Sequence, residues 1–412
     1  RGSKKSDIAF VEVGGTVGDI ESLPFLESIR QFSLDLGKSN AIFVHLTLLP
    51  YINVTNEIKT KPTQHSVKEL RSIGIQPDIL LCRGRNPINQ AMKNKLALFT
   101  NVSKDSVFSA VDAKSIYDIP ILFKEQKIDD CIIKNLGIKT KRLNLKPWND
   151  YRSKVSKCKK SVKVAMIGKY VDLVDSYKSL NEALYHAGVL NSRVVEITYL
   201  DSEKITSANI KSLRFMNAIL VPGGFGNRGI EGKILAAKFA RENNIPYLGI
   251  CLGMQISVIE YARNVLNLKN ANSTEFNIKT NNPVVALVEE WKDRSGNKII
   301  ADKNNLGGTM RLGSQECLLK KNSLVYQMYK KINIAERHRH RYEVNGNLVS
   351  HFDKSNLVFS GISKKGNLME IIELNNHPWY VGCQFHPEFT SSPIKGHPLF
   401  NGFINAASKR KT

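Results

Sequence analysis

Largely apolar runs alternate with amphipathic segments along the chain. Residues 8–13 and 41–49 are such runs, typical of strands buried on both faces of a parallel sheet. The segment between them has apolar residues at helical spacing, with Pro24 near its start and Gly37 at its end, which predicts a helix from about Ser22. Strand followed by helix followed by strand predicts an α/β fold.

The same pattern divides the chain into two domains. Residues 138–160 are polar and rich in lysine, which predicts a linker between a domain at 1–137 and a second domain at 161–412. Thr63 is predicted to cap a helix in the first domain. Strands are predicted at 78–82, 107–110, 162–168, 218–221, 246–250, 369–373 and 379–384. Both domains are predicted to be doubly wound parallel sheets.

Composition sets wide limits on function. The 412 residues are 42% hydrophobic, which is enough for two cores, and no apolar run is long enough to cross a bilayer. The six cysteines show no metal-ligand spacing such as Cys-x-x-Cys. Without such spacing or a secretory leader, the sequence predicts a reduced, cytoplasmic setting and no membrane partner.

The net charge of +23, from 60 basic and 37 acidic residues, raises the alternative of nucleic-acid binding. The lysines are scattered among asparagines, however, and no aromatic-basic module appears. We therefore expect a solvated basic surface and no nucleic-acid partner. Part of the charge suits a polyphosphate substrate, which needs convergent cations.

A cysteine follows the predicted strand 246–250 and opens a helix. Cys251 is flanked by Gly249 and Gly253, as in the elbow that displays the serine of α/β hydrolases. Backbone N–H groups converge at such a helix start, where they stabilise a thiolate and a developing oxyanion. A lone buried cysteine is more often an inert core residue. Cys251 is therefore a candidate nucleophile that needs a partner.

That partner is predicted at His386, with Glu388 to orient its imidazole. Both follow the strand 379–384, so they reach the same sheet edge as Cys251. Alone, His-Pro-Glu could be a turn. The adjacent glycines near Gly224 predict an oxyanion donor, alongside the N–H of Leu252, although a plain tight turn is the simpler reading without Cys251 nearby.

Here the motifs carry a resemblance. Residues 222–226, 249–255 and 386–388, in that order, resemble class I glutamine amidotransferases. Residues 11–27, 57–66 and 74–79 resemble the synthetase domain of CTP synthases, and 272–276 and 337–345 resemble their glutaminase half. The resemblance implies a P-loop-type amidoligase domain followed by a class I glutamine amidotransferase domain. It also implies that ammonia from glutamine aminates UTP to CTP at the expense of ATP.

The resemblance further assigns ligands. It implies that Gln255, Glu275 and Arg341 hold glutamine. The residue types agree with this, because an acid suits the ammonium group of glutamine and a guanidinium suits its carboxylate. Taken alone, Arg341 belongs to a basic run expected to be solvated. His338, His340 and His351 are interpreted as structural or interface residues, because no carboxylate or cysteine stands at metal-ligand spacing.

In the first domain the resemblance assigns nucleotide ligands. The implied contacts are Asp19, Glu21, Lys59, Lys61, Gln64 and Lys95 for UTP or CTP, Arg83 and Asp112 for ATP, and Glu12 for Mg²⁺. Arg228 matches the lid residue used for activation by GTP. From the residues alone, Glu12 ends a predicted strand and the lysines flank a helix start, both plausible near phosphate. A homotetramer with GTP and CTP as effectors is implied as well.

One departure stands out. The family's amidoligase domain begins with a P-loop, and this sequence has no Gly-x-x-x-x-Gly-Lys-[Ser/Thr] match. We interpret the sequence as lacking that part and expect no CTP synthesis from it alone. A glutaminase subunit serving another synthetase is an alternative that residues 59–65 disfavour. A non-catalytic scaffold is another, which an intact Cys251 and His386 disfavour.

Overall fold

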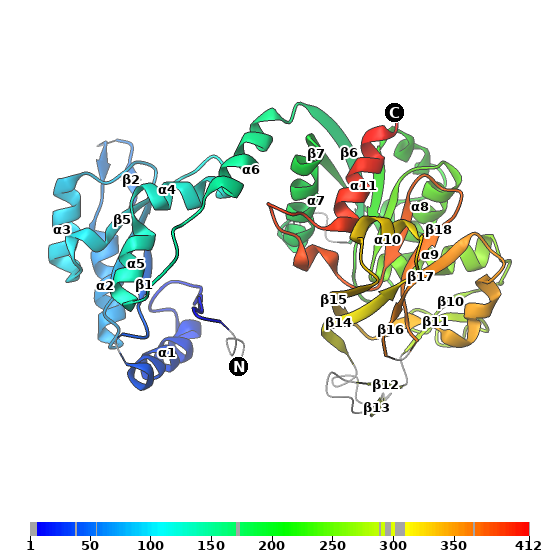
Figure 1. The fold of residues 1–412 in the computed structure, drawn as a ribbon, viewed down its shortest axis with the longest axis horizontal. Coiled ribbons are helices and arrows are strands. Elements are labelled where there is room, and N and C mark those ends of the chain that lie inside the picture. Colours follow the sequence, from blue (N-terminus) through cyan, green and yellow to red (C-terminus); the bar gives the residue numbers. More distant parts are fainter. Residues whose placement is uncertain are drawn as a thin grey trace. The chain divides into compact units, whose positions relative to one another are not determined.

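The computed structural model forms two compact units, Arg1–Arg152 and Ser153–Thr412 (Figure 1). The described residues are 6–37, 39–54, 56–169, 174–287, 290–292, 298–300, 310–365 and 367–411. Predicted linker residues 138–160 include a helix, α6 (Lys146–Lys157), and the first residue of a strand.

The first unit is built on three parallel strands in the order β1-β4-β5. These are β1 (Val44–Leu48), β4 (Ile79–Gly84) and β5 (Val107–Val111). The helices are α1 (Leu23–Leu36), α2 (Lys61–Ser72), α3 (Gln90–Thr100), α4 (Ile119–Glu125) and α5 (Ile128–Leu136), and a small hairpin joins β2 (Tyr51–Ile52) to β3 (Glu57–Ile58). Strands 78–82 and 107–110 and the helix ending at Gly37 are confirmed.

Alternate side chains of β4 enter different cores. Leu80 packs with Leu96 of α3 on one face, and Ile79 packs with Ile128 of α5 on the other. Helices therefore cover both faces of this short sheet.

Three predictions fail in this unit. Residues 8–13 form no strand: the described chain offers them no pairing partner, and Phe10 is 86% exposed. A strand needs neighbours to satisfy its backbone, so apolar character alone does not create one. The second run forms β1 but is buried on one side only, since Leu46 and Leu48 are each 59% exposed. The cap of α2 is Thr60, not Thr63, whose hydroxyl donates to Leu48 O at 3.3 Å.

The second unit contains a nine-stranded sheet in the order β15-β14-β17-β18-β19-β9-β8-β6-β7. Its strands are β6 (Lys160–Gly168), β7 (Arg193–Asp201), β8 (Ala218–Val221), β9 (Tyr247–Ile250), β14 (Arg311–Leu319), β15 (Asn333–His340), β17 (Leu357–Ser363), β18 (Met369–Leu374) and β19 (Tyr380–Cys383). The five strands from β19 to β7 are parallel, whereas β15 to β18 are antiparallel. The sheet is therefore mixed, and the prediction of a purely parallel sheet is wrong.

Two apolar cores lie on opposite faces of this sheet. One contains residues of α8 (Ile230–Glu242) and α9 (Leu252–Asn264), and the other contains residues of α7 (Lys178–Leu190), α10 (Leu324–Tyr329) and α11 (Pro398–Lys409). Residues of β6 alternate between the two, because successive side chains of a strand point to opposite faces.

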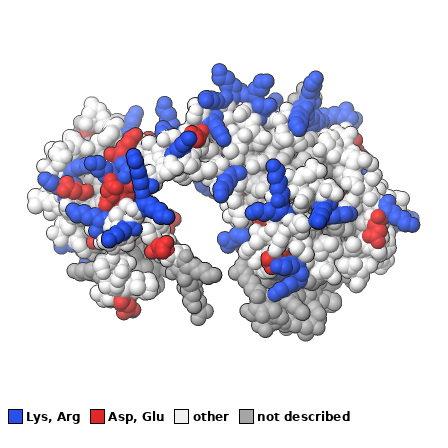
Figure 2. Space-filling model, in the orientation of Figure 1, with Lys and Arg blue, Asp and Glu red and all other residues white. Residues whose placement is uncertain are grey.

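Two small sheets complete the unit, β10-β11-β16 and β12-β13. Their strands are β10 (Asn272–Ser273), β11 (Pro283–Leu287), β16 (Tyr342–Val344), β12 (Glu290–Lys292) and β13 (Lys298–Ile300). Among the described helices of both units, none combines the length and apolar character needed to cross a membrane. Figure 2 shows Lys and Arg side chains spread over the drawn face of both units, with Asp and Glu among them.

Candidate active site

Cys251 sits at a sharp turn between β9 and α9. It is the N-cap residue of α9, with a φ of 53° and a ψ of −104°, a strained backbone for a residue with a side chain. The turn has no room for side chains beside it: a Cβ on Gly253 would lie 2.1 Å from Val221 O, and one on Gly249 would lie 2.5 Å from Gly253 O. The predicted elbow is thus formed, and both glycines are required by close packing.

His386 and Glu388 lie just beyond β19, next to β9 in the sheet. Their side chains are joined by a hydrogen bond of 2.7 Å between Nδ1 and Oε1, and Glu388 is 9% exposed. The imidazole stacks on Phe389, with ring centroids 5.3 Å apart. Glu388 therefore fixes the ring orientation and leaves Nε2 for the reacting groups.

The charges around His386 favour its imidazolium form. Burial opposes that charge, but the interactions with Cys251 and Glu388 outweigh burial and raise the pKa of His386 to about 10. His386 Nε2 has no hydrogen-bond partner within the described structure. Cys251 is nevertheless near enough to raise the pKa of His386, so the thiol and the imidazole are neighbours in this site.

The glycine turn after β8 touches this dyad. A Cβ on Gly223 would lie 2.8 Å from Cε1 of His386 and 3.4 Å from Cβ of Cys251. A Cβ on Gly224 would meet Leu252 Cδ2 at 3.6 Å. The turn thus brings its backbone close to the reacting side chains. Gly223, which was not singled out from the sequence, is the glycine nearest to His386 and Cys251. The oxyanion roles of Gly224 and Leu252 stay predictions.

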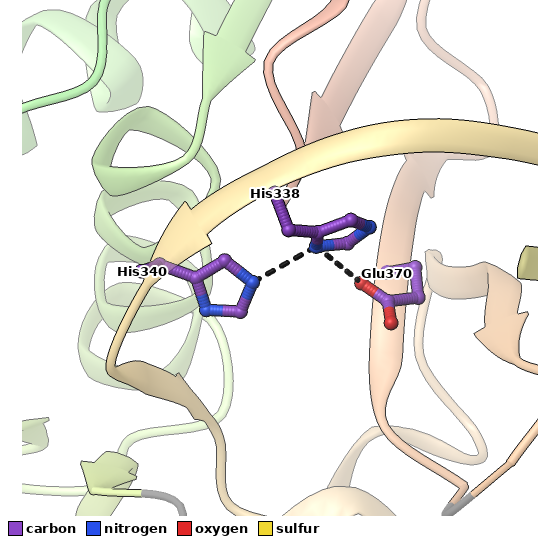
Figure 3. A group of neighbouring side chains, drawn as sticks. All are labelled: His338, His340 and Glu370. Atoms are coloured by element: carbon purple, nitrogen blue, oxygen red, sulfur yellow. Dashed lines mark hydrogen bonds and ion pairs between the residues drawn. The ribbon is translucent and has the colours of Figure 1, made fainter. Parts of the chain in front are cut away.

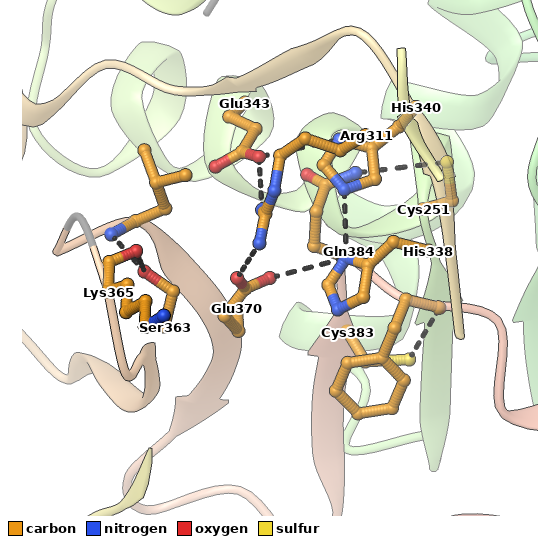
Figure 4. Close-up of polar contacts among 12 residues, drawn as sticks. Cys251, Arg311, His338, His340, Glu343, Ser363, Lys365, Glu370, Cys383 and Gln384 are labelled. Carbon is orange, nitrogen blue, oxygen red and sulfur yellow. Dashed lines mark hydrogen bonds and ion pairs between the residues drawn. The ribbon is translucent and has the colours of Figure 1, made fainter. Parts of the chain in front are cut away.

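Gln255 is hydrogen-bonded to residues next to the active site. Its amide Nε2 donates to Tyr342 O at 2.8 Å and to Gln384 Oε1 at 3.2 Å. Gln384 in turn directs its Nε2 at Cys251 Sγ, 3.8 Å away (Figure 4). Both N–H bonds of Gln255 are used in this way. Its contact with glutamine stays a prediction. Gln384 was missed because a lone glutamine in a strand carries no sequence signal.

Glu275 and Arg341, the other predicted glutamine ligands, are close enough to act on each other. Burial raises the pKa of Glu275, while Gly226, Lys169 and Arg341 counter part of that rise. Glu275 Oε1 accepts a hydrogen bond from Gly226 N at 2.7 Å, and Lys169 Nζ donates to Gly226 O at 3.0 Å. The carboxylate and the lysine therefore hold the end of the glycine turn from two sides.

Arg228 and Lys233 add positive charge to the same region. Arg228 donates to Lys169 O at 3.0 Å and pairs with Glu203 at 3.5 Å. Lys233 is 1% exposed, and burial, with Lys169 and Arg228 nearby, lowers its pKa to about 7. Lys233 was missed because its place in a helical pattern resembles a solvated lysine.

A buried carboxylate anchors the loop that carries Glu388. Glu336 of β15 accepts hydrogen bonds from Tyr329 at 2.8 Å and Thr390 at 3.1 Å, and it contacts His397 Nε2 at 3.0 Å. Of these partners, Thr390 lies before the turn that follows Glu388 and His397 lies after it. The loop is thus tied to the sheet, although its sequence looks like an ordinary turn.

In the first unit, several predicted phosphate ligands gather at the start of α2. Lys61 is its first residue, and Gln64 lies one turn further. Lys59 Nζ donates to Glu57 at 2.5 Å. Lys59, and more weakly Lys95, hold the pKa of the Glu57 carboxyl below its usual value. The structure therefore brings Lys59 and Lys95 around one acid that the sequence analysis did not single out.

The remaining nucleotide candidates lie at the surface. Arg83 and Asp112 pair with each other at 3.5 Å, with side chains 64% and 63% exposed. The Asp19 carboxylate accepts from Thr16 N at 2.9 Å, and Glu21 is exposed. Their nucleotide roles stay predictions.

Glu12 stays a predicted magnesium ligand. It is exposed and ends no strand. Three ligand-type side chains within 4.8 Å of one another occur in one place among the described residues, and Glu12 is not part of it. That place is His338, His340 and Glu370 (Figure 3). Glu370 comes from a distant strand, so residue spacing in the sequence gave no sign of this carboxylate beside the histidines.

Comparison with known proteins gives two family matches, one in each part of the chain. Residues 1–138 match the family model described as CTP synthase N-terminus, and residues 172–406 match the model of class-I glutamine amidotransferases. The chain belongs to the CTP synthase family. It is an α/β protein with a class-I glutamine amidotransferase domain, and members of the family are glutamine-hydrolysing ligases.

Solved structures resemble the second unit. The glutaminase domain of Trypanosoma brucei CTP synthase, with bound acivicin, is 37% identical, with a TM-score of 0.54, over 61% of this chain and 96% of that one. A Thermotoga maritima glutamine amidotransferase is 12% identical, with a TM-score of 0.34, over 61% and 98% of the two chains. A Methylobacillus flagellatus glutamine amidotransferase is 10% identical, with a TM-score of 0.34, over 56% and 70%.

Proposed function

We propose that Cys251, His386 and Glu388 hydrolyse glutamine and that the ammonia so formed aminates UTP to CTP with ATP. The observation that carries this proposal is the strained cysteine elbow beside a histidine held by a carboxylate at 2.7 Å. A cysteine at a helix start and an oriented imidazole are what thioester chemistry requires.

The first half-reaction forms a thioester. The Cys251 thiolate attacks the side-chain amide carbon of glutamine, making a C–S bond, and the oxyanion that results is held by backbone N–H groups of Leu252 and the glycine turn. Collapse breaks the C–N bond, and the His386 imidazolium gives its proton to the departing nitrogen, so ammonia leaves. Glu388 keeps the imidazole in the orientation that this transfer needs.

The second half-reaction releases glutamate. Neutral His386 takes a proton from water, which attacks the thioester carbon and breaks the C–S bond. Cys251 is then a thiolate again, and His386 is again an imidazolium. In this proposal Glu275 binds the ammonium of glutamine and Arg341 its carboxylate. Glu275 can keep the bond that Oε1 accepts from Gly226, because a carboxylate has a second oxygen.

We also propose that Lys59, Lys61 and Lys95 meet the phosphates of UTP or CTP at the start of α2. A helix N-terminus and ammonium groups both attract phosphate. The same proposal includes a P-loop-type first domain, with ATP contacts at Arg83 and Asp112. It also includes GTP activation through Arg228 and a homotetramer in the cytoplasm. Magnesium would accompany ATP, but no step is assigned to an ion at Glu12.

Replacement of Cys251 by Ala tests the glutaminase half. We expect loss of glutamine hydrolysis by several orders of magnitude, as for removal of a nucleophile in other triads. The variant should fold normally, because a thiol-to-methyl change is small. Ammonia release is measured in a coupled assay, and calorimetry measures whether the variant still binds acivicin. Hydrolysis at the wild-type rate in the Cys251→Ala protein would contradict the proposal.

A further inference from the structure

Five ionisable side chains with no part in the reaction above lie buried together beside the active site. We define this buried charge cluster as Arg311, His338, His340, Glu343 and Glu370, each at most 5% exposed. Arg311 donates to Glu370 at 2.9 Å and also to Glu343. His338 Nδ1 and His340 Nε2 face each other at 2.9 Å (Figures 3 and 4). The strands β14, β15, β16 and β18 each contribute.

The cluster is directly attached to the segment that carries the catalytic histidine. Gln384 N donates to Glu370 O at 2.8 Å, and His386 N donates to Arg337 O, next to His338, at 2.8 Å. The His338 ring packs on Phe385, with centroids 5.8 Å apart. The two strands that carry these cluster residues thus hold both ends of the short segment between β19 and His386.

The charges of the cluster do not cancel. Burial first, and Arg311 next, lower the pKa of His338 and His340 well below the usual value, so both rings are neutral. Two carboxylates then face one guanidinium, which leaves one negative charge in excess. An uncompensated buried charge is costly, so the cluster takes up a proton. In agreement, burial raises the pKa of Glu343 to about 8 and also raises that of Glu370.

Because both rings are neutral, that proton resides on one of the two carboxyl groups. Among the described residues, no hydrogen bond reaches His338 Nε2, His340 Nδ1, Glu343 Oε2 or Glu370 Oε2. His340 Nδ1 lies 3.6 Å from Glu343, and His338 Nδ1 lies 3.7 Å from Glu370. The other titratable groups that act on the cluster are Cys317 of β14, which burial keeps as a thiol, and His386.

A metal ion is the alternative occupant of the two histidines and Glu370. Two imidazoles and a carboxylate are a common ligand set for transition metals. Arg311 already supplies the cation that Glu370 needs, however, and the two rings already satisfy each other at 2.9 Å. A divalent ion would leave this buried group with excess positive charge, whereas one proton makes it neutral.

We propose that the buried charge cluster is a positioning device for His386. It holds the segment that carries His386, and the negative charge that appears when its shared proton leaves favours the imidazolium form of that histidine. The inference rests on the proposed glutaminase function. An opposite charge nearby stabilises an imidazolium. His386 therefore keeps the proton that it must give to departing ammonia up to a higher pH than it would without the cluster.

The test is the pH profile of kcat/KM for glutamine hydrolysis in Glu370→Gln. The amide keeps an acceptor for Arg311 but cannot become negative. We expect the basic limb to move down by about one pH unit, the order of shift that one neighbouring charge causes. Glu316→Gln is the matched control, the same change on β14 at a surface pair with Lys364. Its basic limb should coincide with that of the wild type.

The outcomes separate this inference from the proposed function. Absence of hydrolysis in the wild type would contradict the function, whereas an active Glu370→Gln with an unmoved basic limb would contradict only the cluster's role. A second measurement needs no variant. Infrared difference spectra of the wild-type chain should lose a protonated-carboxyl band as pH rises through about 8. No such band at pH 6, or one equivalent of bound transition metal by elemental analysis, would overturn the proposal.

Discussion

At the scale of single residues, burial decides the chemistry of several groups that the sequence presents as ordinary. Lys233 lies on α8 in a pattern that predicts a solvated side chain, yet it is 1% exposed. Cys251 and His386 were recognisable, because each ends a strand in a motif with fixed spacing. Lys233, Gln384 and Glu370 were not, because their environment is created by strands far away in sequence. The motifs therefore predicted the reacting groups and missed the groups that surround them.

Lys233 yields a stability prediction with a definite sign. Its pKa is about 7 in the folded chain and 10.5 ordinarily, so between these values the unfolded chain holds a proton that the folded chain lacks. Stability should therefore rise with pH across that window. Replacement by Met should remove this rise and increase the thermal midpoint most at pH 7 and below. Calorimetry at several pH values measures it, with Lys238→Met on the same helix as control.

An equal gain in the midpoint of Lys233→Met at pH 7 and pH 10 would contradict this assignment, because a purely apolar packing effect has no reason to vary with pH. Lys238 carries the same side chain one and a half turns along α8, where it is partly exposed and contacts Asn264 at 3.3 Å. Its replacement should leave the pH dependence as it is.

At the scale of elements, apolar runs predicted several strands of the large sheet at their observed positions. The strands β6, β8, β9 and β19 each lie between two other strands of the sheet and appear where apolar runs predicted them. The run at 8–13 is equally apolar but unpaired, and it forms no strand. Of the antiparallel half of the mixed sheet, β18 was predicted at 369–373, whereas β14, β15 and β17 were not, and an apolar run gives no strand direction. Pairing, unlike hydrophobicity, is not local information.

The elbow between β9 and α9 should tolerate no side chain at Gly253. A Cβ there would lie 2.1 Å from Val221 O, a backbone atom of β8 that cannot move without the sheet. Gly253→Ala should cost about 1 to 3 kcal/mol, typical of overpacking, and should displace Cys251 enough to lower glutaminase activity. The matched control is Gly346→Ala, where a Cβ would meet nothing within 4 Å. Thermal unfolding and the hydrolysis rate of both variants measure the difference, and equal values for both would count against this view of the elbow.

At the scale of the whole molecule, the two units carry different halves of one function. All the residues proposed for glutamine hydrolysis lie in Ser153–Thr412, and the residues proposed for UTP, CTP and ATP lie in Arg1–Arg152. The order of the two family matches along the chain is the same. Mutations in one unit should therefore separate nucleotide binding from glutamine hydrolysis.

Lys59→Ala and Lys61→Ala test that separation. Each should weaken binding of UTP or CTP by about 1.5 to 3 kcal/mol, the value of a charge-assisted hydrogen bond, because each removes an ammonium from the start of α2. Glutamine hydrolysis without nucleotide should stay at the wild-type rate, since neither lysine belongs to the glutaminase unit. Lys68→Ala is the control, on the same helix but beyond its first turn. Calorimetric titration that finds wild-type affinity in both variants would show that these lysines do not meet the phosphates.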